Sequence, residues 1–194
     1  MFEEALKKRL ECIDSNSVDI SNERIQLEEK QASGVAQVQL HLIHPCIAFK
    51  KLEDKKLQYF NINNCADYVI FENVEKDKWV LHIIEFKRTV KPKEWNEKIK
   101  KQFAGAYLNA LALGGYLGIK ISKVICYTGL RHDKVMSKRE ASPIELRAEV
   151  KRLTQNTDWE SGEIILDVFE TIPCTHKKIQ LDENTGEAAY KLCL

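Results

Sequence analysis

The sequence predicts a mixed α/β (α+β) fold in which a central mixed sheet with an antiparallel meander is flanked by helices. Strand-like runs at residues 66–73 and 79–88 are joined by a short charged turn at 75–78, which is typical of a hairpin. Residues 95–113 then carry apolar side chains at steps of three and four, and a buried strand-like run follows at 123–129. A helix between two strands of one sheet indicates a parallel crossover.

The segments that precede the hairpin predict helices first and a strand later. The first 13 residues show a short amphipathic helical pattern, with four apolar residues on one face: Phe2, Leu6, Leu10 and Ile13. Residues 14–22 are polar turn residues that offer Ser21 or Asn22 as an N-cap. We expect a helix over residues 23–43, with Gly34 as its weak point, and a possible first strand of the meander at 57–61.

Pro92 opens the next helix, and Gly114 and Gly115 are expected to close it. Its apolar stripe consists of Trp95, Ile99, Phe103, Ala106, Ala110 and Leu113. Further along, we expect a helix at 143–153 and a late strand pair, 162–172 with 177–181, around the turn at 182–186. The chain is expected to form one domain over residues 1–194, with a core at about 22–130 and a C-terminal helix and strand-pair extension at about 140–194.

The composition is that of a globular chain and excludes several classes of protein. Because 30 Lys and Arg stand against 29 Asp and Glu, the net charge is +1, and any affinity for nucleic acid must come from a local patch. No apolar run reaches the roughly 18 residues of a membrane span, and the N-terminal residues do not resemble a secretory signal. No two of the six cysteines lie closer than 19 residues, which favours buried thiols in a reducing compartment. We therefore expect a cytoplasmic protein with no membrane partner.

Residues 79–87 are the most informative segment of the chain. Side chains alternate across a strand, so one face presents Trp79, Leu81, Ile83, Glu85 and Lys87, and the other presents Val80, His82, Ile84 and Phe86. Both faces are largely apolar, which predicts a central strand covered on both sides. Glu85 and Lys87 are then about 7 Å apart on one face. Charges near a core are costly unless they are paired or hold a metal ion.

Asp67 lies in the preceding strand, and a meander would bring its carboxylate beside Glu85. The chain contains five acid-x-Lys triplets, but only the one at Glu85 ends a strand-like apolar run. Two other interpretations stay open. Glu85 and Lys87 can form an exposed salt bridge where the strand leaves the core, and Asp67 can be a turn residue after Asn63 and Asn64.

With Cys65-Ala66-Asp67 in one strand and Glu85-Phe86-Lys87 in the next, followed by a helix and a strand, the chain resembles the PD-(D/E)xK nuclease superfamily over roughly residues 22–130. The resemblance implies a restriction-endonuclease-like core. Ala66 stands where the family has a proline. Gln102, 15 residues after Lys87, is similar to a glutamine in the nucleases linked to recombination helicases and CRISPR adaptation, although Tyr107 lies five residues beyond it instead of four.

The resemblance also implies a metal-dependent nuclease that hydrolyses phosphodiester bonds, with DNA favoured over RNA. Asp67 and Glu85, together with the backbone carbonyl of Phe86, would hold Mg²⁺ or Mn²⁺. Lys87 would orient or activate the attacking water, and Gln102 would approach the site from the helix. Glu28 or Glu29, from the first long helix, is a further candidate, and the sequence does not choose between them.

Charge supports contact with a nucleic acid. Residues 87–101 contain seven Lys or Arg against two Glu, a local net charge of +5 that begins at the predicted site. The candidate phosphate contacts are Arg88, Lys91, Lys93, Lys98 and Lys101. The same run can instead be a solvated helix face. The helical spacing of Trp95 favours a core position over a platform for stacking bases.

Two other classes of function stay open. The first is a catalytically inactive nuclease-like fold that acts as a nucleic-acid- or protein-binding module in a defence or mobile-element system. The second is a general interaction domain with an accidental acid-x-Lys triplet, in which the strand of Glu85 would be an edge strand. His41 and His44 lack the further ligands of a zinc site, and His82 is expected to face away from Glu85. A homodimer is plausible for cutting a duplex.

Overall fold

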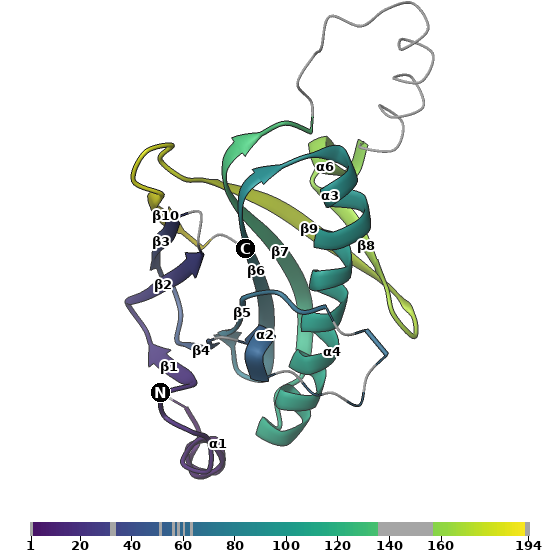
Figure 1. Ribbon diagram of the computed structural model, residues 1–194. Helices are drawn as coiled ribbons and strands as arrows, with labels where there is room; N and C mark the ends of the chain where they lie inside the picture. Colours follow the sequence, from purple (N-terminus) through teal and green to yellow (C-terminus); the bar gives the residue numbers. More distant parts are fainter. Residues whose placement is uncertain are drawn as a thin grey trace, which may run out of the picture.

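The computed structural model describes residues 2–31, 34–50, 52–55, 57, 59, 61–62, 64–135 and 157–192. A seven-stranded mixed sheet has the strand order β1-β4-β5-β6-β7-β9-β8, and a three-stranded sheet has the order β10-β3-β2 (Figure 1). The strands are β1 (Val18–Ser21), β2 (Arg24–Gln31), β3 (Gly34–His41), β4 (Cys46–Phe49), β5 (Tyr68–Glu75), β6 (Lys78–Val90), β7 (Ile121–Asp133), β8 (Glu163–Asp167), β9 (Thr171–Gln180) and β10 (Glu187–Lys191). The predicted mixed α/β class and mixed central sheet are confirmed.

The antiparallel meander consists of β4, β5 and β6, and the tight turn between β5 and β6 contains Asp77, whose φ is 59°. The predicted crossover is also present, because β6 and β7 pair in parallel and a helix connects them. β6 therefore lies between β5 and β7 at the centre of the sheet. This contradicts the interpretation that required an edge strand at Glu85.

The helices are α1 (Glu4–Leu10), α2 (Leu52–Lys55), α3 (Pro92–Glu94), a π-helical turn η1 (Trp95–Ile99), α4 (Lys100–Leu117) and α6 (Thr157–Ser161). Pro92 begins α3, as predicted. The predicted end at Gly114 and Gly115 is wrong, because α4 continues through both glycines to Leu117 and Gly118 terminates it with φ 75°. No helix in the described residues is long and apolar enough to cross a membrane.

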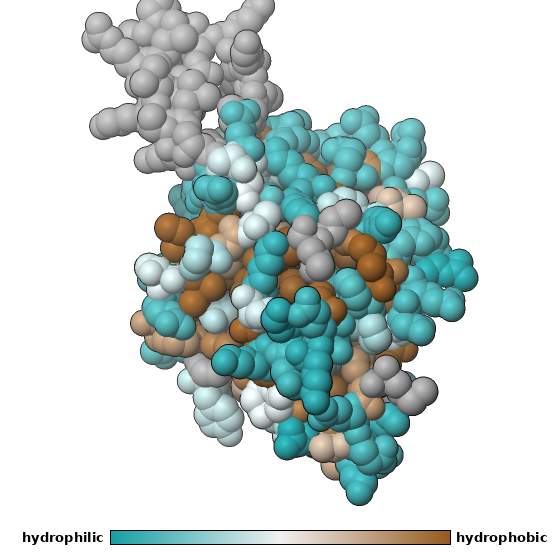
Figure 2. All heavy atoms as spheres, turned by 180° about the vertical axis from the view of Figure 1, so that it is seen from behind, coloured by the Kyte–Doolittle hydropathy of each residue, from teal (hydrophilic) through white to brown (hydrophobic). Residues whose placement is uncertain are grey.

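The seven-stranded sheet is covered on both faces, as the apolar residues on both sides of segment 79–87 predicted. Helix α4 packs on one face, against side chains that include Leu81 and Ile83, and the three-stranded sheet packs on the other, against Val80 and Ile84 (Figure 1). On the surface shown in Figure 2, hydrophobic residues lie in separate patches among hydrophilic ones. Burial of apolar area is the main source of stability, and here it is divided between two core layers.

The helix expected at residues 23–43 is wrong, because this segment forms the hairpin β2–β3. Inward-facing side chains recur every second residue: Ile25 and Leu27 on β2, and Val38 and Leu40 on β3, are all buried. Glu, Gln, Lys and Ala are good helix formers, and this propensity suggested a helix. Burial of the alternating apolar residues against the large sheet outweighs it, and Gly34, with φ 130°, begins the second strand.

Two further expectations differ from the structure. Residues 57–61 form no strand where they are described, and the backbone N–H of Leu57 bonds to the Asn109 side chain at 2.7 Å instead of to a neighbouring strand. The late strands also pair differently from the prediction. β8 pairs with β9, whereas β10, which follows the turn at 182–186, pairs in parallel with β3. The helix expected at 143–153 lies outside the described residues.

The cysteines of the described segments are free thiols, four of them buried, as predicted. His82 faces away from Glu85, also as predicted, and joins a buried polar network between the two sheets. Its Nε2 lies 2.9 Å from the Glu72 carboxylate and its Nδ1 lies 3.0 Å from the Tyr127 hydroxyl. The other oxygen of Glu72 lies 3.0 Å from Nδ1 of His44. These contacts satisfy the buried polar groups.

Arg131 ties the two sheets together at one end. Its guanidinium donates to the backbone carbonyls of Val35 at 2.6 Å and of Glu183 and Asn184 at 3.2 Å each. These three bonds join β7 to the start of β3 and to the turn before β10. Because the guanidinium of Arg131 bonds to three backbone carbonyls, we assign this residue a structural role.

The close approach of α4 to the segment before β5 gives a test of this packing. We expect Gly105→Ala to lower the free energy of unfolding by about 2 kcal/mol or more, because a Cβ there would lie 1.7 Å from the carbonyl oxygen of Asn64. Chemical denaturation measures this change. Gly115→Ala in the same helix is the matched control. Beyond its own helix backbone and chain neighbours, no atom lies within 4 Å of its new Cβ, so it should raise stability by about 0.5–1 kcal/mol. Equal effects of the two substitutions would contradict the packing.

Candidate metal and nucleic-acid site

The two predicted acids lie side by side on the face of the large sheet that α4 covers. Strand β5 begins at Tyr68, which pairs with Ile84, so Asp67 is opposite Glu85. Both side chains are removed from solvent, with Asp67 5% and Glu85 0% exposed. Oδ2 of Asp67 accepts a hydrogen bond from the backbone N–H of Phe86 at 2.7 Å. The pairing of β5 with β6 therefore brings these two acids together.

Lys87 and Gln102 both contact the same oxygen of Glu85. The amide Nε2 of Gln102, on α4, donates to Glu85 Oε1 at 2.6 Å, and the ammonium of Lys87 forms an ion pair with that oxygen. The other oxygen, Oε2, is buried and has no hydrogen-bond partner among the described residues. A buried carboxylate oxygen without a partner is rare in proteins, and it suggests a group that binds there.

The site lacks enough positive charge for its acids. Burial raises the pKa of Asp67, and the charge of Glu85 raises it further, against the hydrogen bond from Phe86. Burial also raises the pKa of Glu85, although Lys87 and the bond from Gln102 oppose this shift. For Lys87, burial lowers the pKa, but the attraction of Glu85 outweighs it and the net pKa is raised. A divalent cation would relieve the cost of ionising both carboxylates.

The donors present fit Mg²⁺ or Mn²⁺, which prefer oxygen ligands. N–H and C=O of one strand residue point to the same side, so the carbonyl of Phe86 points toward Asp67, beyond the start of β5. Among the described residues, no three His, Cys, Asp or Glu side chains lie close enough together to hold a metal ion. A cation at Asp67 and Glu85 would therefore take its other ligands from the carbonyl, water or a substrate phosphate, as Mg²⁺ commonly does.

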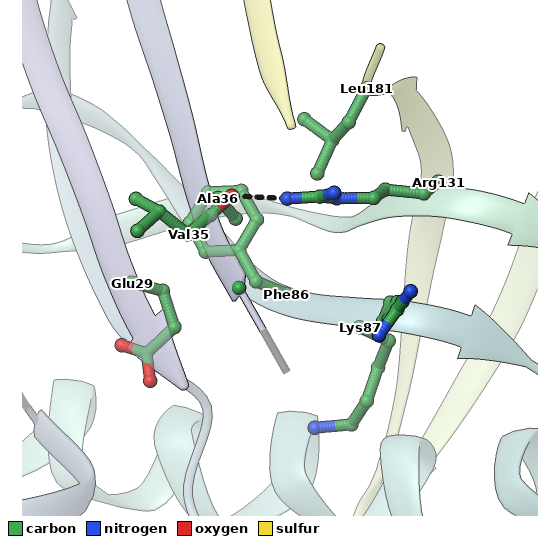
Figure 3. Close-up of a pocket in the computed structure, with 9 residues that line it drawn as sticks. Glu29, Val35, Ala36, Phe86, Lys87, Arg131 and Leu181 are labelled. Carbon is green, nitrogen blue, oxygen red and sulfur yellow. Dashed lines mark hydrogen bonds between the residues drawn. The ribbon is translucent and has the colours of Figure 1, made fainter. Parts of the chain in front are cut away.

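Glu28 and Glu29 lie on β2 and not on a helix, which corrects their predicted setting. They point in opposite directions. The exposed Glu28 carboxylate pairs with Lys30 at 2.9 Å, whereas Glu29 lines a small pocket together with Lys87 (Figure 3). The negative charge of Glu29 also contributes to the raised pKa of Asp67. Of the two acids that the sequence left open, Glu29 is the one that faces the site.

Next to Glu85, on strand β7, lies a residue that no sequence pattern identified as a candidate. Thr128 on β7 is the register partner of Glu85, and its hydroxyl lies 2.9 Å from Nε2 of His176 on β9. Burial lowers the pKa of His176 to about 3, so the imidazole is neutral at pH 7. Only strand pairing brings these residues together, since Thr128 is 43 positions from Glu85, and the chain near Thr128 carries no motif.

The predicted phosphate contacts lie along β6, α3, η1 and the start of α4. The members of this basic ridge, Arg88, Lys91, Lys93, Lys98 and Lys101, are all exposed. Lys93 has an ion-pair partner in Glu97 at 3.9 Å. Lys100, in the same run, is instead paired with Asp158 in the structure. Trp95 is fully buried against Trp159 and Phe103, which confirms its core position.

Comparisons of the chain with models of protein families, with curated proteins and with solved structures find no match. A proposal for its function therefore depends on the residues of the site.

The buried acid pair predicts how stability changes with pH when no divalent cation is present. Because the pKa of Asp67 is raised in the folded protein, the folded state binds more protons than the unfolded state above about pH 4. This stabilisation is complete below about pH 4 and is lost as the pH rises through the folded-state pKa. Between pH 5 and pH 9 the free energy of unfolding of the wild type should therefore fall by more than about 1 kcal/mol because of Asp67. The variant Asp67→Asn should not show this fall.

Thermal or chemical unfolding in the presence of a chelator, at several pH values, measures this difference. Asp77→Asn is the matched control, because Asp77 is an exposed turn residue whose φ of 59° suits asparagine. Its stability should keep the pH dependence of the wild type. Parallel curves for the wild type and Asp67→Asn would contradict the raised pKa.

Proposed function

We propose that the protein is a metal-dependent nuclease of the PD-(D/E)xK type that hydrolyses phosphodiester bonds in nucleic acid, with DNA favoured over RNA as the substrate. The observation that carries the proposal is the pair of buried carboxylates, Asp67 directly before β5 and Glu85 on the neighbouring β6. Lys87 and Gln102 are bonded to one oxygen of Glu85, and the other oxygen is without a partner among the described residues. Asp67 lies directly before β5, and Glu85 and Lys87 lie on β6 ahead of a crossover helix, an arrangement that supports a restriction-endonuclease-like core.

Each residue of the site has a chemical task in this proposal. Asp67, Glu85 and the carbonyl of Phe86 would hold Mg²⁺ or Mn²⁺, which when bound polarises a phosphate oxygen and lowers the pKa of an attacking water. Lys87 donates hydrogen bonds to that water or to a phosphate oxygen and adds positive charge where negative charge develops. Gln102 donates to Glu85 and holds its carboxylate so that Oε2 stays open.

The basic ridge supports a nucleic acid as the substrate. Its exposed cations begin at Arg88, next to Lys87, and continue along the start of the helix that also carries Gln102. Lys and Arg side chains along one path neutralise successive phosphates and release counterions. The net charge of the whole chain is only +1, so this local arrangement has to supply the attraction.

A cleavage assay tests the enzyme proposal. We expect the wild type to cut DNA in the presence of Mg²⁺ or Mn²⁺ and to be inactive with a chelator. Glu85→Gln and Lys87→Met should each lower the rate by about 100-fold or more, because each removes charge that acts on the transition state. Glu75→Gln and Lys78→Met, at an exposed ion pair in the β5–β6 turn, are the matched controls and should cut at the wild-type rate.

Two results would contradict the nuclease. One is the absence of cleavage of single- and double-stranded DNA and RNA by the wild type in either metal. The other is full activity in Glu85→Gln. Tight binding of nucleic acid without any cleavage would instead support the inactive binding module.

The basic ridge has its own test, which does not require cleavage. Lys98→Gln combined with Lys101→Gln should weaken DNA binding and reduce the slope of log affinity against log salt by about 1–2, because about 0.9 counterions are released per phosphate contact. Fluorescence anisotropy at several salt concentrations measures this slope. Lys120→Gln with Lys123→Gln, two exposed lysines near the opposite end of β6, is the control and should leave the slope unchanged. An unchanged slope for the first pair would exclude the ridge from the interface.

A further inference from the structure

The phenol of Tyr68 holds the three-stranded sheet to the strand that begins beside Asp67. The hydroxyl of Tyr68 accepts a hydrogen bond from the backbone N–H of Glu28 at 3.0 Å and donates one to the backbone carbonyl of the same residue at 2.6 Å. One side chain thus satisfies both backbone groups of a residue 40 positions away. A contact with two short bonds fixes the distance between the two strands more narrowly than one bond does.

These bonds lie at an open strand edge. β2 is the outer strand of its sheet, and β3 pairs with it on one side only. Since the N–H and C=O of one residue point to the same side, the groups of Glu28 that meet Tyr68 point away from β3. The phenol therefore takes the place of a neighbouring strand at this position. Unpaired edge groups would otherwise depend on water.

This contact holds the backbone of the residue directly before Glu29. Ile25, Leu27 and Glu29 share one face of β2, and the first two are buried in the core at 3% and 0% exposure. Glu29 continues this inward-facing row beyond the core, where it lines a cavity of about 20 Å³ with Lys87. This volume has room for about one water molecule. Figure 3 shows Glu29 and Lys87 reaching this cavity from two different strands, with Phe86 between them.

The hairpin is fixed at its other strand as well. Val35, at the start of β3, accepts the bond from Arg131 (Figure 3). Arg131 acts on the backbone of β3, where Val35 precedes Ala36, the register partner of Glu29. Tyr68, by contrast, acts on the residue directly before Glu29 and directly follows Asp67. Tyr68 thus couples the strand that carries Glu29 to the strand that begins beside Asp67.

We infer that Tyr68 is a positioning residue that holds Glu29 near Asp67 and Lys87, which makes the three-stranded sheet a part of the cation site. The inference rests on the proposed function. Glu29 acts through its charge and through water and not as a third direct ligand, because no three acidic side chains of the described residues are close enough for that. Groups that act on a bound metal through its outer shell change its affinity by about 10–100-fold.

The test is a titration of the protein with Mn²⁺ alone, in which electron paramagnetic resonance measures the concentration of the free ion. Tyr68→Phe keeps the ring, which packs edge-to-face on Phe86 with centroids 6.1 Å apart, and removes only the hydroxyl. We expect Tyr68→Phe and Glu29→Gln each to weaken Mn²⁺ binding by about tenfold, and the double variant to bind no more weakly than Glu29→Gln alone. Glu28→Gln, whose carboxylate points away, and Tyr116→Phe, which loses a bond to Arg9, should bind as the wild type does.

Hydrogen exchange of the Glu28 amide provides a second measurement that is independent of metal. Exchange should become faster in Tyr68→Phe and stay unchanged in Glu29→Gln, since only the first variant removes the acceptor. Wild-type affinity in either Tyr68→Phe or Glu29→Gln would overturn the inference and leave the nuclease proposal standing. So would losses that simply add in the double variant. A wild-type protein that binds no Mn²⁺ would overturn both.

Discussion

The desolvation of two neighbouring carboxylates is the constraint on which the site depends. Asp67 and Glu85 are almost completely buried, and their pKa values are raised because burial disfavours the charged forms. Lys87 supplies one positive charge directly at Glu85. One lysine does not compensate two ionised acids, and Glu29 adds further negative charge nearby. Such an arrangement lowers the stability of the fold, which is reasonable where a cation or a reaction requires it.

The surrounding fold creates this arrangement through a small number of contacts. β5 begins one residue after Asp67. The backbone N–H of Phe86 therefore bonds to the Asp67 side chain, at a position where a longer β5 would provide backbone groups. Gly105 allows α4 to approach the chain before β5, and this brings Gln102 within reach of Glu85. On the other face, Arg131 and Tyr68 hold the three-stranded sheet. The acid pair thus lies between the large sheet and α4, and Glu29 reaches its neighbourhood from the three-stranded sheet.

Much of the large sheet could be predicted from local patterns. The alternation over residues 79–88, the charged turn at 75–78 and the stripe from Trp95 to Ala110 depend on neighbours in sequence, and all three are confirmed. The helix predicted over residues 23–43 is wrong for a physical reason. Its Glu, Gln and Lys residues favour a helix, whereas its inward-facing Ile25, Leu27, Val38 and Leu40 are buried only if the segment pairs as strands.

Local patterns predicted that Glu85 and Lys87 share a face, that Asp67 lies across the hairpin from Glu85 and that Gln102 follows on the crossover helix, because strand alternation and hairpin pairing are local properties. Asp67 itself lies one residue before β5 and not within the predicted strand 66–73. The tertiary fold alone places Glu29 and not Glu28 toward Asp67, and Thr128 next to Glu85. It also decided that Tyr68 anchors the second sheet. These relations join residues far apart in the chain, and they depend on which strands pair and which faces are buried, so no local pattern encodes them.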